Sequence, residues 1–427
     1  MQLYRRNFLK HASASALTAP FLTAAGNARD ATEAASTALP PPTDPSFWDK
    51  VRDQFMLSRD KVFFNNGTIG AMPRVVFERY VDELRKLAVD VADWDYRSDE
   101  TNWIGGYGPQ TEIRAKAARL LNATVPELAL TENVTAGVSF ISGGLNLPPG
   151  SEILITNQEH EGGKSSWLAE AKRRNWVVTP VKMPAPVRDP EQVLEVFKQA
   201  ITPRTKVIAV SHVITGTGAI LPAKEICAQA RDRGIFTLLD GAQAFGHVKV
   251  DVQDLGCDAY AGCFHKWMLA PPGTGFLYLR KDRSREVWST VASGQWDNYD
   301  DSGYRFTQRG TGSLGALLGL NAALDFHFAV GPEQVQQRIK YLGDYLRDGL
   351  HKIPKVTIYS PQDNAMCAGI TVYGVEGITG RKLQEEMWNR DRLRPRGSGH
   401  YSVRHCTHMY NSTAEIDRAL KVVRDLA

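Results

Sequence analysis

Between residues 152 and 240, short runs of apolar residues alternate with segments of helical periodicity. The apolar runs are residues 152–156, 206–211 and 235–240, and the helical segments are residues 194–201 and 222–233. Near-continuous apolar runs are typical of strands buried on both faces, which occur in parallel sheets covered by helices. The pattern therefore predicts an α/β fold with a parallel sheet.

The rest of the chain extends this domain and adds a smaller one. The predicted elements are a helix at 76–87, a strand at 273–279 and a long helix at 311–351. We expect the long helix to break at Gly331-Pro332, because proline lacks the amide that a helix interior needs. After it, two strands and helices at 380–390 and 414–427 predict a smaller α+β domain.

The first 28 residues have the three parts of an export signal. The basic start contains Arg5-Arg6, and a weakly apolar run from Ala12 to Ala25 ends in small residues. The paired arginines resemble the bacterial twin-arginine signal, which predicts passage through the twin-arginine translocase to the periplasm. The alternative is a short basic amphipathic helix. A run of about 14 residues is too short for a bilayer span of about 20, so we expect no stable membrane anchor.

Residues 29–46 are rich in Ala, Thr and Pro, which predicts a linker between the signal and the folded part. We expect an N-terminal segment and large domain at 47–310. A long connecting helix and the small C-terminal domain then occupy 311–427.

The charge of the folded part is close to neutral. The 427-residue chain has a formal net charge of +4, and Arg5, Arg6 and Lys10 supply three of these charges, which leaves +1 from residue 29 onward. A domain this near neutrality has no global attraction to nucleic acid or to an anionic membrane. The five cysteines are widely spaced without a CxxC pair, so a disulfide framework is not indicated, although one bridge stays open.

Lys266 is the residue with the clearest chemical implication. It lies in the apolar stretch 259–270, and a lysine ammonium is costly to bury. Such a lysine either reaches water from the end of a strand or serves as a reactive amine, for example in a Schiff base. The residue alone leaves both interpretations open.

Asp240 adds a second chemical group at the end of the predicted strand 235–240. Ligands of open α/β sheets bind outside the carboxyl ends of the strands. A carboxylate there can pair with a pyridinium nitrogen, and Gln243 could donate to the phenolate oxygen of the same ring. A strand-end aspartate is also a common helix cap, but Asp240 and Gln243 followed 23 residues later by Lys266 favour a pyridine cofactor.

Together these residues resemble the fold-type-I pyridoxal 5'-phosphate (PLP) enzymes of aminotransferase class V. This family includes cysteine desulfurases, isopenicillin N epimerase-like proteins and kynureninase. The resemblance covers about residues 47–427 and implies a PLP-binding large domain with a mostly parallel seven-stranded sheet, followed by the small α+β domain. It implies that Lys266 binds the cofactor covalently and that Asp240 pairs with the ring nitrogen. It further implies that Gln243 reaches the ring oxygen and that His160 stacks on the ring face.

The resemblance also implies a phosphate site. Residues 131–137 match the family's phosphate-binding loop and helix start, with Thr135 and the Ala136 amide on the phosphate. The free amides and dipole of a helix N-terminus suit that role. Cys263 and His265 are also expected near the phosphate, and Cys263 stands where relatives often carry serine.

Two further segments complete the implied site. Residues 309–312 match a segment that reaches the phosphate from a second subunit, so Thr311 implies a homodimer. Arg404 matches the arginine that clamps the substrate α-carboxylate, and its alternative is a surface salt bridge. We expect Asn66 to bind the substrate, from a loop that shapes the substrate site. Histidine and cysteine follow Arg404, but neighbouring side chains on a strand point to opposite faces, so we expect no metal site.

The sequence also separates the activities of the family. Desulfurases need a nucleophilic cysteine shortly before the carboxylate-binding arginine, and residues 380–403 contain none. An exported member resembles the periplasmic enzymes that tailor pyoverdine siderophores in fluorescent pseudomonads. This implies conversion of the siderophore's glutamate side group to succinamide by decarboxylative oxidation at the α-carbon. The alternatives are an exported aminotransferase or epimerase acting on another amino acid, and a non-enzymatic binding module that keeps the PLP fold.

Overall fold

The computed structural model describes residue 41, residues 43–93 and residues 107–427. The predicted export signal and the linker up to residue 40 lie outside the described residues. The compact unit from Pro42 to Ala427 contains every helix and strand named below. Its first helix, α3 (Pro45–Arg52), begins inside the stretch predicted as linker, because the Asp44 carboxylate caps its first amides.

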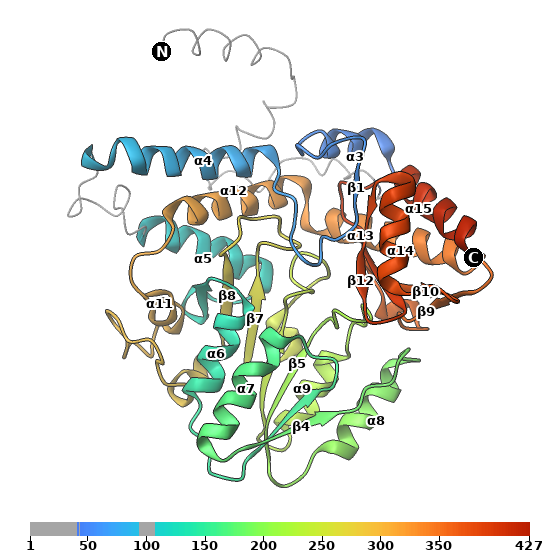
Figure 1. Cartoon of the computed structure of the whole chain (residues 1–427). Coiled ribbons are helices and arrows are strands. Elements are labelled where there is room, and N and C mark those ends of the chain that lie inside the picture. The colour runs from blue at the N-terminus through green and yellow to red at the C-terminus, as the bar shows by residue number, and fades with distance from the viewer. Residues whose placement is uncertain (1–40, 42, 94–106) are drawn as a thin grey trace. The chain divides into compact units, whose positions relative to one another are not determined.

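Seven strands form the central sheet (Figure 1). From edge to edge they are β2 (Leu128–Thr131), β8 (Gly275–Leu279), β7 (Ala259–Cys263), β6 (Phe236–Asp240), β5 (Thr205–Ser211), β3 (Glu152–Thr156) and β4 (Val177–Val181). β8 runs antiparallel to both neighbours, and the other adjacent pairs are parallel. The mostly parallel seven-stranded sheet is confirmed. The sequence did not predict β2, β4 or β7; β4 is an edge strand that contains Pro180 and half-exposed side chains.

Helices cover both faces of this sheet. Those of the large domain are α4 (Arg74–Val89), α5 (Tyr107–Leu121), α6 (Val134–Gly144), α7 (Glu161–Arg174), α8 (Pro190–Ala200), α9 (Ala223–Arg231), α10 (Val252–Leu255) and α11 (Ser302–Thr307). Side chains alternate along a strand, so Ile153 and Ile155 of β3 join the core with α6 and α7, while Leu154 joins the core with α5, α8 and α9. Figure 1 shows α6 and α7 side by side on their face.

The long helix breaks where the sequence predicted. α12 (Leu314–Val330) and α13 (Pro332–Leu350) meet at Gly331, whose φ of 95° is open to glycine. Within the described part of the chain, no single helix has the length and apolarity of a membrane span. α12 and α13 together pass that test by length and composition, with a bend of 78° between them.

The smaller domain is built on a four-stranded antiparallel sheet. Its order is β12 (Arg396–Ser398), β13 (Ser402–Cys406), β10 (Ile370–Val375) and β9 (Val356–Ile358). The helices α13, α14 (Gly380–Asp391) and α15 (Thr413–Leu426) pack on it around a separate apolar core. The sequence predicted two strands in this domain, whereas this sheet has four. The short strand β12, for example, has no apolar pattern that could reveal it.

One strand of the small domain pairs with the start of the chain. β1 (Val62–Phe63) lies parallel to β11 (Leu393–Arg394). This pairing brings the loop after β1, which contains Asn65, Asn66 and Gly67, next to β13, where Cys406 forms a bridge with Asn65. An N-terminal loop therefore lies beside the carboxyl part of the chain.

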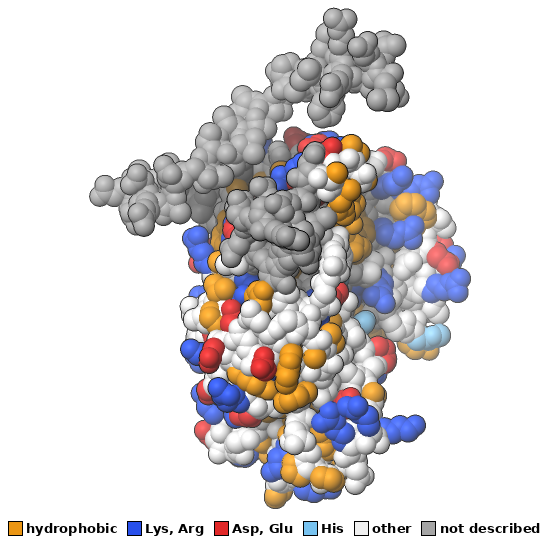
Figure 2. Space-filling view, turned by 90° about the vertical axis from the view of Figure 1, so that its left-hand side faces the viewer, with side chains coloured by type: hydrophobic (Ala, Val, Ile, Leu, Met, Phe, Trp, Pro, Cys, Tyr) orange, Lys and Arg blue, Asp and Glu red, His pale blue; other side chains and the backbone are white. Residues whose placement is uncertain are grey.

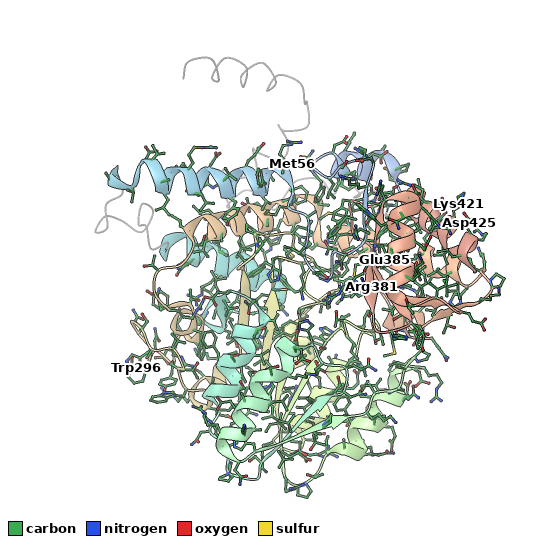
Figure 3. The ribbon with its side chains drawn as sticks, viewed as in Figure 1. Met56, Trp296, Arg381, Glu385, Lys421 and Asp425 are labelled. Atoms are coloured by element: carbon green, nitrogen blue, oxygen red, sulfur yellow. The ribbon has the colours of Figure 1, made fainter. Side chains whose placement is uncertain are left out.

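Large apolar side chains reach the surface on one side of this unit. Figure 2 shows them in patches on the left-hand face of Figure 1, and Figure 3 places Trp296 at that side. Trp288 is 57% exposed and Trp296 39%, and their ring centroids lie 5.4 Å apart. An exposed apolar cluster of this kind is a candidate contact surface.

Candidate active site

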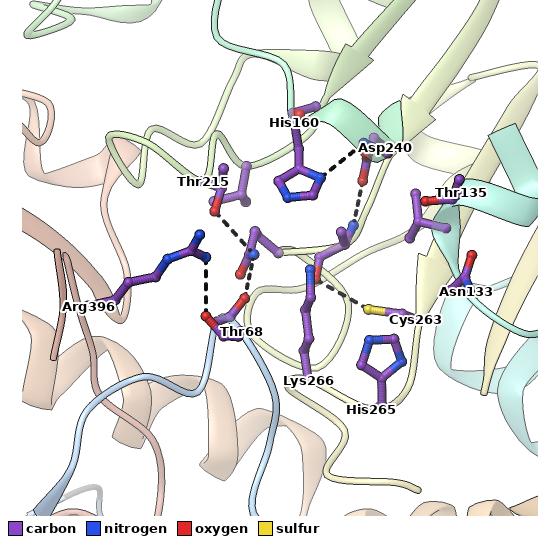
Figure 4. Close-up of a pocket in the computed structure, with 17 residues that line it drawn as sticks. Thr68, Asn133, Thr135, His160, Thr215, Asp240, Cys263, His265, Lys266 and Arg396 are labelled. Atoms are coloured by element: carbon purple, nitrogen blue, oxygen red, sulfur yellow. Dashed lines mark hydrogen bonds between the residues drawn. The ribbon is translucent and has the colours of Figure 1, made fainter. Parts of the chain in front are cut away.

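A pocket of about 260 Å³ lies beyond the carboxyl ends of three neighbouring strands (Figure 4). Ser211, Asp240 and Cys263 end β5, β6 and β7, and all three side chains line it. The predicted site residues that line it are His160, Thr135, Asp240, Gln243, Cys263, His265 and Lys266. The pocket therefore lies at the end of the sheet where the sequence predicted ligand binding.

Lys266 presents its side chain to this pocket. It follows β7 in a stretch that includes the buried residues Phe264 and Trp267, yet it is itself only half-buried. Its carbonyl accepts a hydrogen bond from Asn66 Nδ2 at 3.3 Å, which fixes the backbone on which the amine stands. The structure therefore favours the interpretation of Lys266 as a reactive amine, because its side chain lines a pocket.

Asp240 lies on another wall of the pocket as a buried carboxylate. Its Oδ1 accepts from the Ala242 amide at 2.8 Å. Burial raises the pKa of Asp240, while that amide and the charges of Lys266 and His160 act in the opposite direction. A Cβ at Gly163 would stand 2.8 Å from Asp240 Oδ2, so the start of α7 passes directly against the carboxylate. The carboxylate is confined and suited to pairing with a cationic ring nitrogen.

His160 caps α7 and contributes a neutral ring to the pocket. Its Nδ1 accepts from the Gly162 amide at 3.1 Å. Burial lowers the pKa of His160, and the nearby Lys266 charge lowers it further. A neutral imidazole in a fixed orientation suits the stacking role that the sequence predicted.

Gln243 is held at both ends of its amide. Nε2 donates to the Gly67 carbonyl at 2.8 Å and to Thr215 Oγ1 at 3.3 Å, while Oε1 accepts from Trp267 Nε1 at 2.9 Å. Both amide hydrogens are already used. A bond from Gln243 to a ring oxygen would have to replace the longer contact with Thr215.

The expected phosphate end is assembled, with one correction. α6 begins at Val134, and Thr135 lines the pocket. The Ala136 amide does not face it freely, because it donates to the N-cap oxygen Asn133 Oδ1 at 2.9 Å. The sequence interpretation overlooked that an asparagine N-cap satisfies this amide. Asn133 itself lines the pocket and was not predicted.

Cys263 and His265 lie at the pocket with partners of their own. Cys263 Sγ donates to the Ala242 carbonyl at 3.6 Å, and burial raises the pKa of this thiol to about 11. His265 Nδ1 lies 3.2 Å from the Thr274 carbonyl, and burial lowers the pKa of its ring. Cys263 therefore stays a neutral thiol at physiological pH.

Arg404 lies on β13 beside the pocket and is only 3% exposed. Its guanidinium donates to Thr68 Oγ1 at 3.0 Å, to Asn65 Oδ1 at 3.2 Å and to Thr215 Oγ1. Thr68 and Thr215 line the pocket, so Arg404 reaches its wall. Among the described residues no carboxylate forms an ion pair with it, which makes the surface salt bridge wrong.

Asn66 and Thr311 do not line the pocket. Asn66 is fully buried behind Lys266, where it also accepts from Tyr410 Oη at 3.0 Å. The prediction that Asn66 contacts the substrate is therefore corrected. Asn66 instead supports the backbone of the Lys266 segment. Thr311 is exposed before α12 and does not line the pocket of its own chain; its role toward a second subunit stays a prediction.

Arg396 is the most informative residue that the sequence interpretation missed. It lines the pocket from β12, opposite Arg404 in the strand register. A charged residue between proline and glycine gives no local signal of this position, which depends on pairing across the small sheet. Within the described ranges, no group of three or more His, Cys, Asp or Glu side chains could hold a metal ion.

The pocket, with an amine and an acid beyond the strands of this sheet, defines the class of PLP-dependent enzymes of fold type I. Residues 62–421 match the aminotransferase class V family, and the chain belongs to this family. It is 31% identical to isopenicillin N epimerase of Streptomyces clavuligerus, over 87% of this chain and 96% of that protein. It is 27% identical to a probable cysteine desulfurase of Xylella fastidiosa, over 92% and 99% of the two chains.

Solved structures agree with this assignment. The cystine C-S lyase C-DES in complex with cysteine persulfide has a TM-score of 0.77 and 26% identity, over 86% of this chain and 98% of that one. A C-DES mutant with glycine covalently linked to the PLP cofactor has a TM-score of 0.79 and 26% identity, over 88% and 99%.

The pocket of this chain fits PLP on its own geometry. It places an amine, a confined carboxylate and a neutral imidazole around one cavity, with the N-terminus of α6 at its edge. Lys266 would hold the aldehyde carbon, Asp240 the ring nitrogen and Thr135 the phosphate. The protein is a PLP-dependent enzyme of this family.

Proposed function

We propose that this protein is an exported PLP enzyme that converts the glutamate side group of a pyoverdine siderophore to succinamide, as the periplasmic enzyme PvdN does. The observation that carries the proposal is the combination of the predicted twin-arginine signal with a PLP pocket whose one lining cysteine among the described residues, Cys263, is buried. All five cysteines are buried, whereas a desulfurase needs a thiol that can reach its substrate.

The residues around the pocket have distinct roles in this reaction. When bound, PLP withdraws electrons from the α-carbon of an amino acid joined to it. Arg404 orients the substrate through its α-carboxylate, and Asp240 would keep the ring nitrogen of the bound cofactor protonated. The Lys266 amine, which would hold the cofactor, would also be placed to move a proton at the α-carbon. The siderophore-linked glutamate keeps a free α-amino group and α-carboxylate, so it offers the groups that these residues bind.

The overall reaction balances with dioxygen as oxidant. The α-carboxyl group leaves as carbon dioxide, the α-carbon becomes the amide carbon, and the amino nitrogen is retained. One dioxygen supplies one oxygen atom to the amide and one to water. The proposal therefore requires oxygen consumption together with carbon dioxide release.

We further propose a periplasmic homodimer in which Thr311 contacts the cofactor phosphate of the other subunit. Residues 310–313 are exposed in the single chain, which leaves this loop accessible to a second copy. The exposed pair Trp288 and Trp296 offers apolar surface for such a contact.

The second candidate is an exported aminotransferase or epimerase acting on another amino acid. The similarity to isopenicillin N epimerase over almost the whole chain favours it. The binding-module alternative is set aside because the chain belongs to an enzyme family.

The test is to incubate the purified holoenzyme in air with pyoverdine that carries the glutamate side group, and separately with free glutamate. Mass spectrometry should show the succinamide form of the siderophore, and an oxygen electrode should show matching oxygen uptake. Turnover of free glutamate or another small amino acid with the siderophore unchanged would move the assignment to the second candidate.

A further inference from the structure

Two arginines converge on one hydroxyl group at the pocket. Arg404 Nη2 donates to Thr68 Oγ1 at 3.0 Å, and Arg396 Nη1 donates to the same oxygen at 3.3 Å. They extend from neighbouring strands, since Arg396 pairs with Arg404 in the register of β12 and β13. Two cationic groups are thus fixed side by side at the substrate end of the cavity.

Among the described residues, no acid compensates this pair. The guanidinium groups of Arg396 and Arg404 donate to hydroxyl and amide oxygens, neither forms an ion pair with a described Asp or Glu, and Asp240 is the only Asp or Glu among the residues that line the pocket. Figure 4 shows Asp240 across the pocket from Arg396. Burial lowers the pKa of Arg396, and the charge of Arg404 lowers it further. Like charges held together repel each other, so a site of this kind favours a ligand with negative charge.

The two arginines also differ in depth. Arg404 is buried, whereas Arg396 belongs to the exposed side chains and lies at the mouth. One α-carboxylate bound at Arg404 leaves Arg396 with donors for a second group. A short side chain that ends in an oxygen acceptor can bridge the two positions.

We propose that Arg396 is a specificity-determining residue that binds the distal carboxylate or acyl oxygen of the substrate side chain. The substrate class is then an amino acid with an acidic or acyl side chain, such as glutamate or a glutamyl amide. This inference deepens the proposed function and rests on it for the entry of an amino acid into the pocket. Because the guanidinium is planar and always charged, it binds a carboxylate through two parallel bonds and an amide oxygen through one.

The test measures binding of molecules without an amino group, so that no reaction on the cofactor interferes. Calorimetric titration of the holoenzyme, in a buffer free of polyvalent anions, compares glutarate, glutaramate and butyrate. The variants are Arg396→Gln and Arg396→Lys. The matched control is Arg381→Gln, which removes an exposed arginine of the same domain that pairs with Glu385 on α14 (Figure 3).

We expect wild type and Arg381→Gln to bind glutarate about tenfold more tightly than butyrate, the effect of one charge-assisted contact. Glutaramate should fall between them. Arg396→Gln should abolish the preference and leave butyrate binding within about twofold of wild type, and Arg396→Lys should restore part of it.

Two results would overturn the inference. Equal weakening of butyrate and glutarate would mean that Arg396 helps Arg404 to hold the α-carboxylate. An unchanged glutarate preference in Arg396→Gln would mean that Arg396 does not contact the second group. Neither result depends on siderophore turnover, so failure of the proposed function is recognised separately, by an unchanged siderophore in the mass spectrometric test.

Discussion

Replacement of Gly163 by alanine tests whether the position of Asp240 controls cofactor binding. Gly163 is the third residue of α7, and an added Cβ would stand 2.8 Å from Asp240 Oδ2. Ordinary carbon–oxygen contacts begin near 3.3 Å, so the carboxylate or the helix has to move by about 0.5 Å. Asp240 is buried and bound to the Ala242 amide, which leaves it little freedom to move.

The stability effect of this substitution is the difference of two opposing contributions. Alanine is about 1 kcal/mol more favourable than glycine in a helix. Overpacking of a close-packed site costs about 1–3 kcal/mol. The free energy of unfolding of the apoprotein should therefore fall by about 0–2 kcal/mol, and the fold should persist.

The effect on PLP should be larger than the effect on the fold. If the displaced carboxylate loses its charge-assisted bond to the ring nitrogen, affinity falls by about 1.5 kcal/mol or more, which is about tenfold. Titration of apoprotein with PLP, followed by absorbance, measures this affinity. Urea unfolding of the apoprotein measures stability in parallel.

Gly294→Ala is the matched control, because an added Cβ there meets nothing within 4 Å. Its PLP affinity should equal that of wild type. Wild-type PLP affinity and spectrum in Gly163→Ala would refute the reasoning, because the crowded carboxylate would then have no part in holding the ring.

The remaining predictions concern the lysine, the buried arginine and the export signal. Lys266→Ala should retain the fold by circular dichroism but lose the borohydride-reducible cofactor adduct; an adduct at wild-type occupancy would assign another lysine. Arg404→Lys should raise KM for amino acid substrates about 10-fold or more, because one ammonium replaces two parallel donors, whereas Arg418→Lys, whose partner Asp391 lies outside the pocket, should leave KM unchanged. Replacing both Arg5 and Arg6 by Lys should keep the precursor in the cytoplasm, and mature protein in the periplasmic fraction would contradict the twin-arginine assignment.

Local sequence patterns were sufficient to predict much of the fold. The apolar run 152–156 coincides with β3, and the strand ending at Asp240 coincides with the end of β6. Strands buried on both faces have a continuous apolar sequence, and proline disfavours the helix interior while it is tolerated in a first turn. These signals depend on a few adjacent residues. The break of the long helix at Gly331 could therefore be predicted as well.

The sequence alone also predicted several of the chemical groups that meet at the pocket. Lys266 in an apolar stretch and Asp240 at a strand end each have an alternative use, but their combination favours a ligand site, and their positions follow from the rule that ligands bind beyond the carboxyl ends of parallel strands. The sequence did not predict the short or irregular elements, among them the strand that begins at Arg396, because their burial depends on partners far away in the chain.

Only the tertiary structure decided the substrate end of the pocket. The loop with Thr68 reaches Arg404 because β1 pairs with β11, more than 300 residues later in the chain. Arg396 joins them through the register of β12 and β13, and Asn66 turns away to hold the Lys266 backbone. Such contacts are set by strand pairing and packing between distant segments. A linear pattern carries no trace of them, since each residue's neighbours in space are not its neighbours in sequence.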